Sequence, residues 1–192
     1  MLRRLTMMRG SFAKRCTIVI IASICIFRSS IAHAQTSKEV EYRFKAVYIL
    51  NFLQFVEWPD SAFPNQDAPI VLAVLGEDPF GKVLDETVQS EKIGARSIVV
   101  KRFHSLGEFS PCQVLFVSSS EKESFHSVLR RIGDSSTLTV SDMDDFGGQG
   151  GGIGFFMDNN KLRFEINMQA LKVADLKASS KLLRLARVIN PI

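Results

Sequence analysis

The chain has 192 residues, of which 46% are apolar and 23% are charged. This composition excludes a disordered chain, a collagen and a low-complexity polymer, and the length suffices for one domain with an ordinary hydrophobic core. Three cysteines are too few for a disulfide scaffold. The formal net charge of +4 suggests a basic protein, but the surplus lies in the first 34 residues.

Residues 1–34 have the layout of a secretory signal peptide. Residues 16–27 form an apolar run of twelve residues, which is too short to span a bilayer as a helix. Ala32-His33-Ala34 supplies the small residues that signal peptidase needs, so we predict cleavage between Ala34 and Gln35. An uncleaved amphipathic anchor is the alternative. The positive region before the apolar run contains no acidic residue and consists of Arg3, Arg4, Arg9, Lys14 and Arg15.

Cleavage would change the charge balance. Residues 1–34 contain six of the 24 Lys and Arg residues and no Asp or Glu, so residues 35–192 keep 18 basic and 20 acidic residues, a net charge of −2. Binding of nucleic acid by bulk charge is therefore not expected. Export of so small a chain fits a bacterial periplasm. Cys112, the one cysteine left, predicts either an intermolecular bridge or a buried inert thiol, and its apolar neighbours favour burial.

The apolar pattern predicts strands that alternate with helices, which is typical of an α/β fold with parallel pairing. In chain order we expect a helix at 38–57 that ends at Trp58-Pro59, a strand at 70–75, a helix at 80–90 with Asp78 as its N-cap, strands at 97–103 and 114–117, a helix at 121–132 that ends at Gly133, and a strand at 137–140. The second half of the first helix is apolar nearly all round, which predicts that it is deeply buried or shared with a partner.

The pattern changes after residue 146. Strands at 153–157 and 162–166 flank Asn159-Asn160, which favours a tight hairpin turn, and helices are expected at 168–176 and 179–189. The fold class is therefore α/β and Rossmann-like, with a mostly parallel sheet flanked by helices and a C-terminal β-hairpin with helices. No linker or repeat divides residues 35–192, so we predict a single domain there.

Several motifs resemble chemical sites without meeting their requirements. Gly76–Val83 nearly spells a phosphate-binding loop, but Val83 lacks the hydroxyl that holds Mg²⁺ and Pro79 lacks an N–H. The glycine-rich run 147–154 precedes a strand rather than a helix, so close backbone packing explains it better than dinucleotide binding. His104 and His126 lack metal-ligand spacing. No catalytic residue, cofactor or metal is predicted, and the acidic residues Asp142, Asp144 and Asp145 are expected to flank a solvated turn.

Seven segments together resemble the YfiR family of periplasmic proteins: 45–59, 74–81, 112–118, 138–142, 151–155, 163–167 and 182–187. The resemblance implies a non-enzymatic regulator that binds the periplasmic part of an inner-membrane diguanylate cyclase and lowers cyclic di-GMP, and with it biofilm formation. It also implies an outer-membrane lipoprotein that can sequester the inhibitor. A periplasmic module that binds a small ligand without a cyclase partner is the alternative function, and a homodimer stays open.

The resemblance also implies where the binding site lies. The family's ligand site, near the end of the first helix and the start of the last, corresponds to Glu57, Trp58, Lys177 and Ser179. Aromatic residues dominate interface energetics, so we expect Phe55, Trp58 and Phe63 to anchor a partner. The type member carries cysteine pairs that this chain lacks, because Ala73 replaces a cysteine and residues 142–154 contain none. Redox control by internal disulfides is therefore not expected.

The signal-peptide prediction can be tested directly. Protein recovered from the periplasmic fraction should begin at Gln35 when its N-terminus is sequenced. A full-length product retained in the inner membrane would instead establish the uncleaved anchor.

Overall fold

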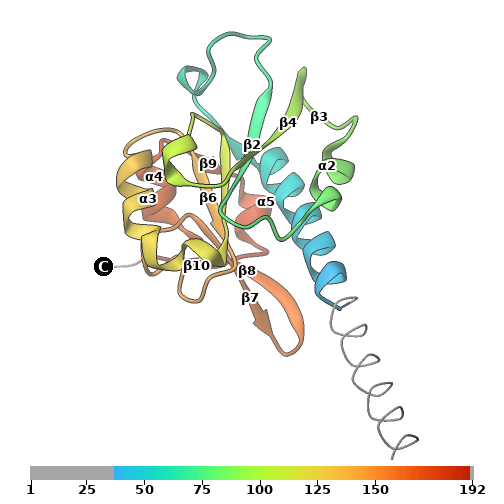
Figure 1. Cartoon of the computed structure of the whole chain (residues 1–192). Coiled ribbons are helices and arrows are strands. Elements are labelled where there is room, and N and C mark those ends of the chain that lie inside the picture. The colour runs from blue at the N-terminus through green and yellow to red at the C-terminus, as the bar shows by residue number, and fades with distance from the viewer. Residues whose placement is uncertain (1–36, 191–192) are drawn as a thin grey trace, which may run out of the picture. The chain divides into compact units, whose positions relative to one another are not determined.

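The computed structural model of the protein describes residues 37–190 (Figure 1). The chain divides into two units, Met1–Glu41 and Tyr42–Ile192. In the first unit, residues 37–41 are helical, and the predicted signal peptide lies outside the described residues. In the second unit, residues 42–55 form a helix, called here the first helix. Within the described part of the chain, no helix is both long and apolar enough to cross a membrane.

The strands of the second unit are β1 (Val56–Glu57), β2 (Ile70–Leu75), β3 (Lys92–Ile93), β4 (Arg96–Phe103), β5 (Val114–Val117), β6 (Leu138–Ser141), β7 (Ile153–Asp158), β8 (Lys161–Asn167), β9 (Lys177–Ala178) and β10 (Arg187–Ile189). The α-helices that follow the first helix are α2 (Lys82–Val88), α3 (Phe125–Ile132), α4 (Met168–Val173) and α5 (Ser180–Leu183). Short 3-10 helices occupy Asp60–Ala62, Leu106–Glu108 and Ser119–Ser124.

Among the described residues, eight strands form one sheet in the order β10-β8-β7-β6-β5-β2-β4-β3, and β1 pairs with β9 separately. The pairs from β4 through β2, β5 and β6 to β7 are all parallel, whereas β8 runs antiparallel to β7. The hairpin turn uses Asn159 and Asn160 with φ of 48° and 62°. The fold is therefore α/β, with a mostly parallel sheet flanked by helices and a C-terminal hairpin, as the sequence predicts.

Both faces of the central strands are buried, which explains their continuous apolar runs. In β2, Leu72 and Val74 pack with the first helix and α2, while Ala73 and Leu75 pack with α3 on the opposite face. Alternate residues of a strand point to opposite faces, so β2 and β5 each contribute to two hydrophobic clusters. The sheet thus forms a middle layer between two helical layers.

Four predicted helices are shorter than expected, and among them the helix predicted at 168–176 ends at Val173 as α4. The first helix ends at residue 55, because Val56 and Glu57 pair with β9 instead. Asp78 does not cap α2: its carboxylate accepts the backbone N–H of Phe80, and α2 begins only at Lys82. The segment predicted as a helix from 121 begins as a 3-10 helix, and α3 starts at Phe125.

The prediction of a last helix at 179–189 is wrong over the second half of that range. Arg187–Ile189 is strand β10, which pairs in parallel with β8. Leu182 is buried but Leu185 is 68% exposed, so a longer helix would have little apolar surface to bury. The Arg187 guanidinium also donates to Glu165 from Nε at 3.1 Å and lies over the Phe156 ring, which fastens the strand to the sheet edge.

The glycine-rich run is packed closely against its surroundings. A Cβ on Gly151 would come within 2.2 Å of the Phe146 ring, and a Cβ on Gly152 would come within 2.9 Å of the Thr139 carbonyl oxygen. Gly150 has a φ of +98°, which side-chain-bearing residues rarely adopt. The glycines are therefore needed for packing and backbone conformation at the entry to β7.

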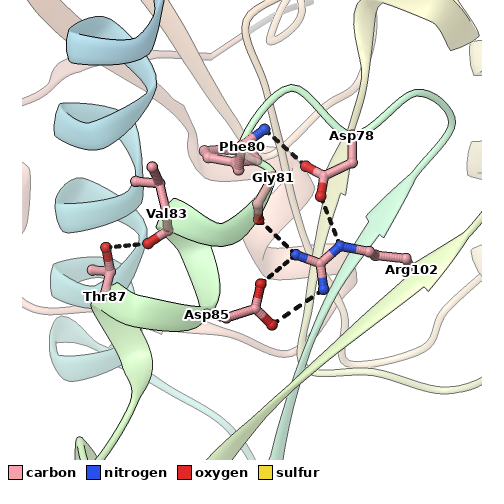
Figure 2. A network of polar contacts seen from close by, with 7 residues as sticks. All are labelled: Asp78, Phe80, Gly81, Val83, Asp85, Thr87 and Arg102. Carbon is pink, nitrogen blue, oxygen red and sulfur yellow. Dashed lines mark hydrogen bonds and ion pairs between the residues drawn. The ribbon is translucent and has the colours of Figure 1, made fainter.

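The loop that resembles a phosphate-binding loop is held by Arg102 (Figure 2). The guanidinium donates to Asp78 at 2.7 Å, to the Gly81 carbonyl at 2.8 Å and to both carboxylate oxygens of Asp85. These bonds tie the start of α2 to β4. The hydrogen bond from Arg102 holds the pKa of Asp85 below its ordinary value. The polar groups of this loop thus stabilise the fold.

The pairing of Arg102 with Asp85 predicts that the stability of the fold depends on pH. A carboxylate whose pKa is lowered by folding stabilises the native state above its unfolded pKa of about 3.9, and the stabilisation is lost as the pH falls through the folded value. Asp85→Asn should therefore lower the free energy of unfolding at pH 7 by at most about 1 kcal/mol, because the pair is partly exposed. The difference from wild type should shrink below about pH 4.

Chemical denaturation at a series of pH values would measure this effect. Glu86→Gln, which removes an adjacent exposed carboxylate, is the matched control and should leave stability nearly unchanged at every pH. A deficit in Asp85→Asn that stays constant to pH 2.5, below the carboxylate range, would contradict the role given to the ionised carboxylate.

Candidate partner-binding site

The short pairing of β1 with β9 brings the end of the first helix to the start of α5. Glu57 lies opposite Lys177 in this antiparallel pair. The backbone N–H of Ser179 donates to the Phe55 carbonyl at 2.8 Å, and the Ser179 hydroxyl caps α5 by accepting the Leu182 N–H. Residues that are about 120 positions apart in the sequence therefore share one surface, which we call the helix-end site: Phe55, Glu57, Trp58, Lys177 and Ser179.

A small cavity of about 90 Å³ lies in the helix-end site. Its lining residues are Glu57, Trp58, Pro59, Asp175 and Lys177. Pockets for metabolites and cofactors usually have volumes of about 300–1,000 Å³, so this cavity is too small for such a ligand. Its volume admits a group about the size of one side chain. Two carboxylates, of Glu57 and Asp175, and the ammonium of Lys177 lie at its edge.

Trp58 is half-buried, and its position is fixed by a hydrogen bond. The indole Nε1 donates to the Gln113 carbonyl oxygen at 3.2 Å, while the ring packs against the hydrophobic core. An indole has only this one donor, so the bond determines which edge of the ring stays accessible. The residue therefore combines core packing with a surface at the cavity.

Gln113 is the residue of this region that sequence reasoning missed. It is 6% exposed and directly precedes β5. Its side chain accepts the Val71 N–H at 2.8 Å and donates to the Ala62 carbonyl at 2.7 Å, so it joins the start of β2 to the loop after β1. The available signal was a lone amide at the start of an otherwise apolar strand, because a buried amide must be hydrogen-bonded.

Phe63 lies outside both the helix-end cavity and the β1–β9 pairing that joins the other predicted site residues. The Arg96 guanidinium lies over its ring at 3.8 Å and also donates to the Ala68 carbonyl. Phe63 therefore holds the loop before β2 against the start of β4. The structure groups Phe55, Glu57, Trp58, Lys177 and Ser179 together, while Phe63 has a separate place.

The first helix has one buried apolar face and two exposed apolar side chains. Ala46, Ile49 and Phe52 are fully buried, in agreement with the predicted burial. Phe44 and Val47, however, are 58% and 46% exposed. They lie three positions apart and so occupy the same side of the helix. This pair, called the exposed helix pair, adds a second apolar surface on the element that leads into the helix-end site.

A buried ion pair fixes the rotation of the first helix. Lys45, which is 3% exposed, donates from Nζ to Asp142 at 2.6 Å, and the Tyr42 hydroxyl donates to the same oxygen at 2.7 Å. The prediction that Asp142 flanks a solvated turn is therefore wrong. This carboxylate directly follows β6 and neutralises the buried Lys45 of the first helix. Asp144 and Asp145 are exposed. A buried charge left without its partner is costly, so the pair holds the helix in one orientation.

The reactive groups of the described residues include one thiol and the imidazoles and carboxylates that could hold a metal ion. Cys112 is buried, as predicted, and burial raises the pKa of its thiol to about 12, so it carries no thiolate at neutral pH. Within residues 37–190, no group of three or more His, Cys, Asp or Glu side chains is arranged to hold a metal ion.

Comparison with known proteins adds a family match. A model described as YfiR/HmsC-like matches residues 42–187, well over half of the chain. A search of curated proteins gave no match. One similar solved structure is titled as an ABC domain in complex with L-Trp from Streptococcus pneumonia, with 11% identity and a TM-score of 0.48 over 62% of this chain. This chain spans 55% of that protein's length.

The role of Gln113 can be tested through Trp58, the one tryptophan in the sequence. Gln113→Leu leaves the Val71 N–H and the Ala62 carbonyl without their side-chain partners, which should cost about 2 kcal/mol or more. The loop after β1 should loosen, and the fluorescence of Trp58 should shift to longer wavelength. Gln89→Leu, at an exposed position after α2, is the control. An unchanged spectrum in Gln113→Leu would contradict the link between Gln113 and the site.

Proposed function

Since this chain belongs to the YfiR/HmsC-like family, we propose that it is a periplasmic, non-enzymatic regulator that binds and restrains an inner-membrane diguanylate cyclase. In this proposal the protein binds the periplasmic part of the cyclase and lowers cyclic di-GMP, which reduces biofilm formation. An outer-membrane lipoprotein that competes for the same surface would relieve the inhibition. The inhibition is carried by binding, and it requires no chemical step by this chain.

The observation that carries the proposal is the half-buried Trp58 beside a cavity of about 90 Å³. The volume of this cavity suits a single side chain of another protein and is too small for a metabolite. Binding hot spots typically centre on tryptophan, tyrosine and arginine in well-packed pockets, with less important contacts around them. Trp58 has this character, and Glu57 and Lys177 supply charges at the rim.

The exposed helix pair extends this surface along the first helix. Phe44 exposes more than half of its surface although it is a large aromatic residue. Burial of apolar area contributes about 25 cal/mol per Å², so covering Phe44 and Val47 would add favourable free energy to an interface. The buried Lys45–Asp142 pair holds the helix that carries these side chains in one orientation before the partner arrives, which reduces the entropy lost on binding.

The proposal predicts a specific genetic result. Deletion of the gene should raise cellular cyclic di-GMP, and the rise should disappear when the cognate cyclase gene is also deleted. Complementation with Trp58→Ala or Phe44→Glu should fail to lower cyclic di-GMP, because each change removes an apolar anchor. The nucleotide can be measured by mass spectrometry of cell extracts.

Two controls make this result specific. Met157→Glu places the same charge at another exposed apolar position, in the β7–β8 hairpin, and should complement like wild type. Each variant must be present in the periplasm with wild-type circular dichroism. If cyclic di-GMP does not change in the deletion strain under several growth conditions, the cyclase proposal fails in favour of a periplasmic module that binds a small ligand. If Trp58→Ala unfolds the protein, Phe44→Glu alone decides whether the first helix contacts the partner.

A further inference from the structure

A second cavity is larger than the helix-end cavity and shares no lining residue with it. Its volume is about 430 Å³, which is within the usual range for small-molecule pockets. It lies between α3 and α4, which Figure 1 shows beside one another, and the β6 strand forms its floor. Leu129 and Ile132 of α3 form one wall, and Ala170 and Val173 of α4 form the other.

Two glycines of the glycine-rich run, Gly148 and Gly150, line this cavity. A Cβ on Gly148 would meet a carboxylate oxygen of Asp145 at 2.2 Å, so this glycine allows a close approach within the loop. A Cβ on Gly150 would lie only 3.2 Å from Leu129 Cδ1, so the loop already passes close over α3. The run that sequence analysis assigned to backbone packing therefore also shapes a cavity.

The lining of the cavity carries no charge. It includes apolar side chains, hydroxyls and amides, but no Asp, Glu, Lys, Arg or His. Transfer of a charged group from water to such surroundings is costly when no opposite charge compensates for it. The cavity therefore selects for uncharged molecules, in contrast to the helix-end cavity with its carboxylates and ammonium.

The polar groups on the floor are already oriented by the fold. Thr137 donates to the Cys112 carbonyl at 2.7 Å, and the amide of Asn167 donates to the Gly147 carbonyl at 2.9 Å. Thr139 Oγ1 accepts the N–H of Gly152 at 2.8 Å, which leaves the hydroxyl proton of Thr139 to be donated. Thr139 is 6% exposed, and the hydrogen bond from Gly152 holds its Oγ1 in place before any ligand arrives.

We propose that the α3–α4 cavity binds a small, uncharged, mainly apolar molecule that carries a hydrogen-bond acceptor. The apolar body of the ligand packs between Leu129 and Val173, and its acceptor receives the proton of Thr139. The proposal depends on the walls and floor of this cavity and is independent of the cyclase partner.

A fluorescent probe of this chemistry tests the site. Prodan, an uncharged naphthalene ketone, should bind the purified protein with a saturable shift of its emission to shorter wavelength. Ala170→Phe, which fills the cavity, and Val173→Trp, which closes its exposed rim, should each weaken binding by about tenfold or more. Ala95→Phe, in the exposed loop between β3 and β4, and Lys177→Ala, in the helix-end site, should bind like wild type.

A matched pair of competitors tests the charge selection. 2-Acetylnaphthalene should displace prodan, whereas 2-naphthoate, which has nearly the same shape but carries a negative charge, should not. Equal displacement by both would overturn the selection for uncharged ligands. Absence of saturable binding, or binding that survives Val173→Trp or is lost in Lys177→Ala, would overturn the site itself. Val173 is half-exposed, so its replacement provides a decisive variant even if Ala170→Phe does not fold.

Discussion

Burial of β2, β5 and β6 on both faces is the constraint on which the other features depend. β2 and β5 contribute to two separate hydrophobic clusters, one under the first helix and α2 and one under α3, whereas β6 contributes Leu138 and Val140 to the first cluster. Polar groups at the strand ends therefore have little access to water and must find partners within the protein. Gln113 at the start of β5 and Asp142 after β6 are the two clearest cases, and each fixes a neighbouring element through its hydrogen bonds.

The carboxyl ends and the amino ends of the central strands have different surroundings. In open α/β folds, ligands usually bind outside the carboxyl ends of the strands, where the strand order reverses. Here that position lies between β2 and β5, and a Cβ on Gly76 would be 2.4 Å from Ser120 Oγ. The Glu77 N–H also donates to this hydroxyl, so the two loops close on one another. Both cavities instead lie toward the amino ends of β5 and β6, beside Gln113 and Thr137.

The two cavities differ in size and charge, and so they suit different molecules. The helix-end cavity is small and bordered by charged groups, which fits a side chain of a protein partner. The α3–α4 cavity is larger and uncharged, which fits a small apolar ligand. The two functions first considered as alternatives can therefore belong to separate surfaces of one protein. Because α4 leads through Leu176 to β9, a ligand between α3 and α4 would lie on the element that precedes the helix-end site.

The sequence by itself determined the fold class, the buried central strands, the hairpin and the buried cysteine, because each depends on local apolar pattern or turn residues. It did not determine β1, β3, β9 or β10, since strands of two or three residues form only when a neighbouring edge offers hydrogen bonds. The grouping of Glu57, Trp58 and Lys177 followed from resemblance, and only the tertiary structure placed Phe63 elsewhere and identified Gln113. The burial of Lys45 with Asp142 was likewise decided in three dimensions, because an ion pair between residues 97 positions apart leaves no local pattern.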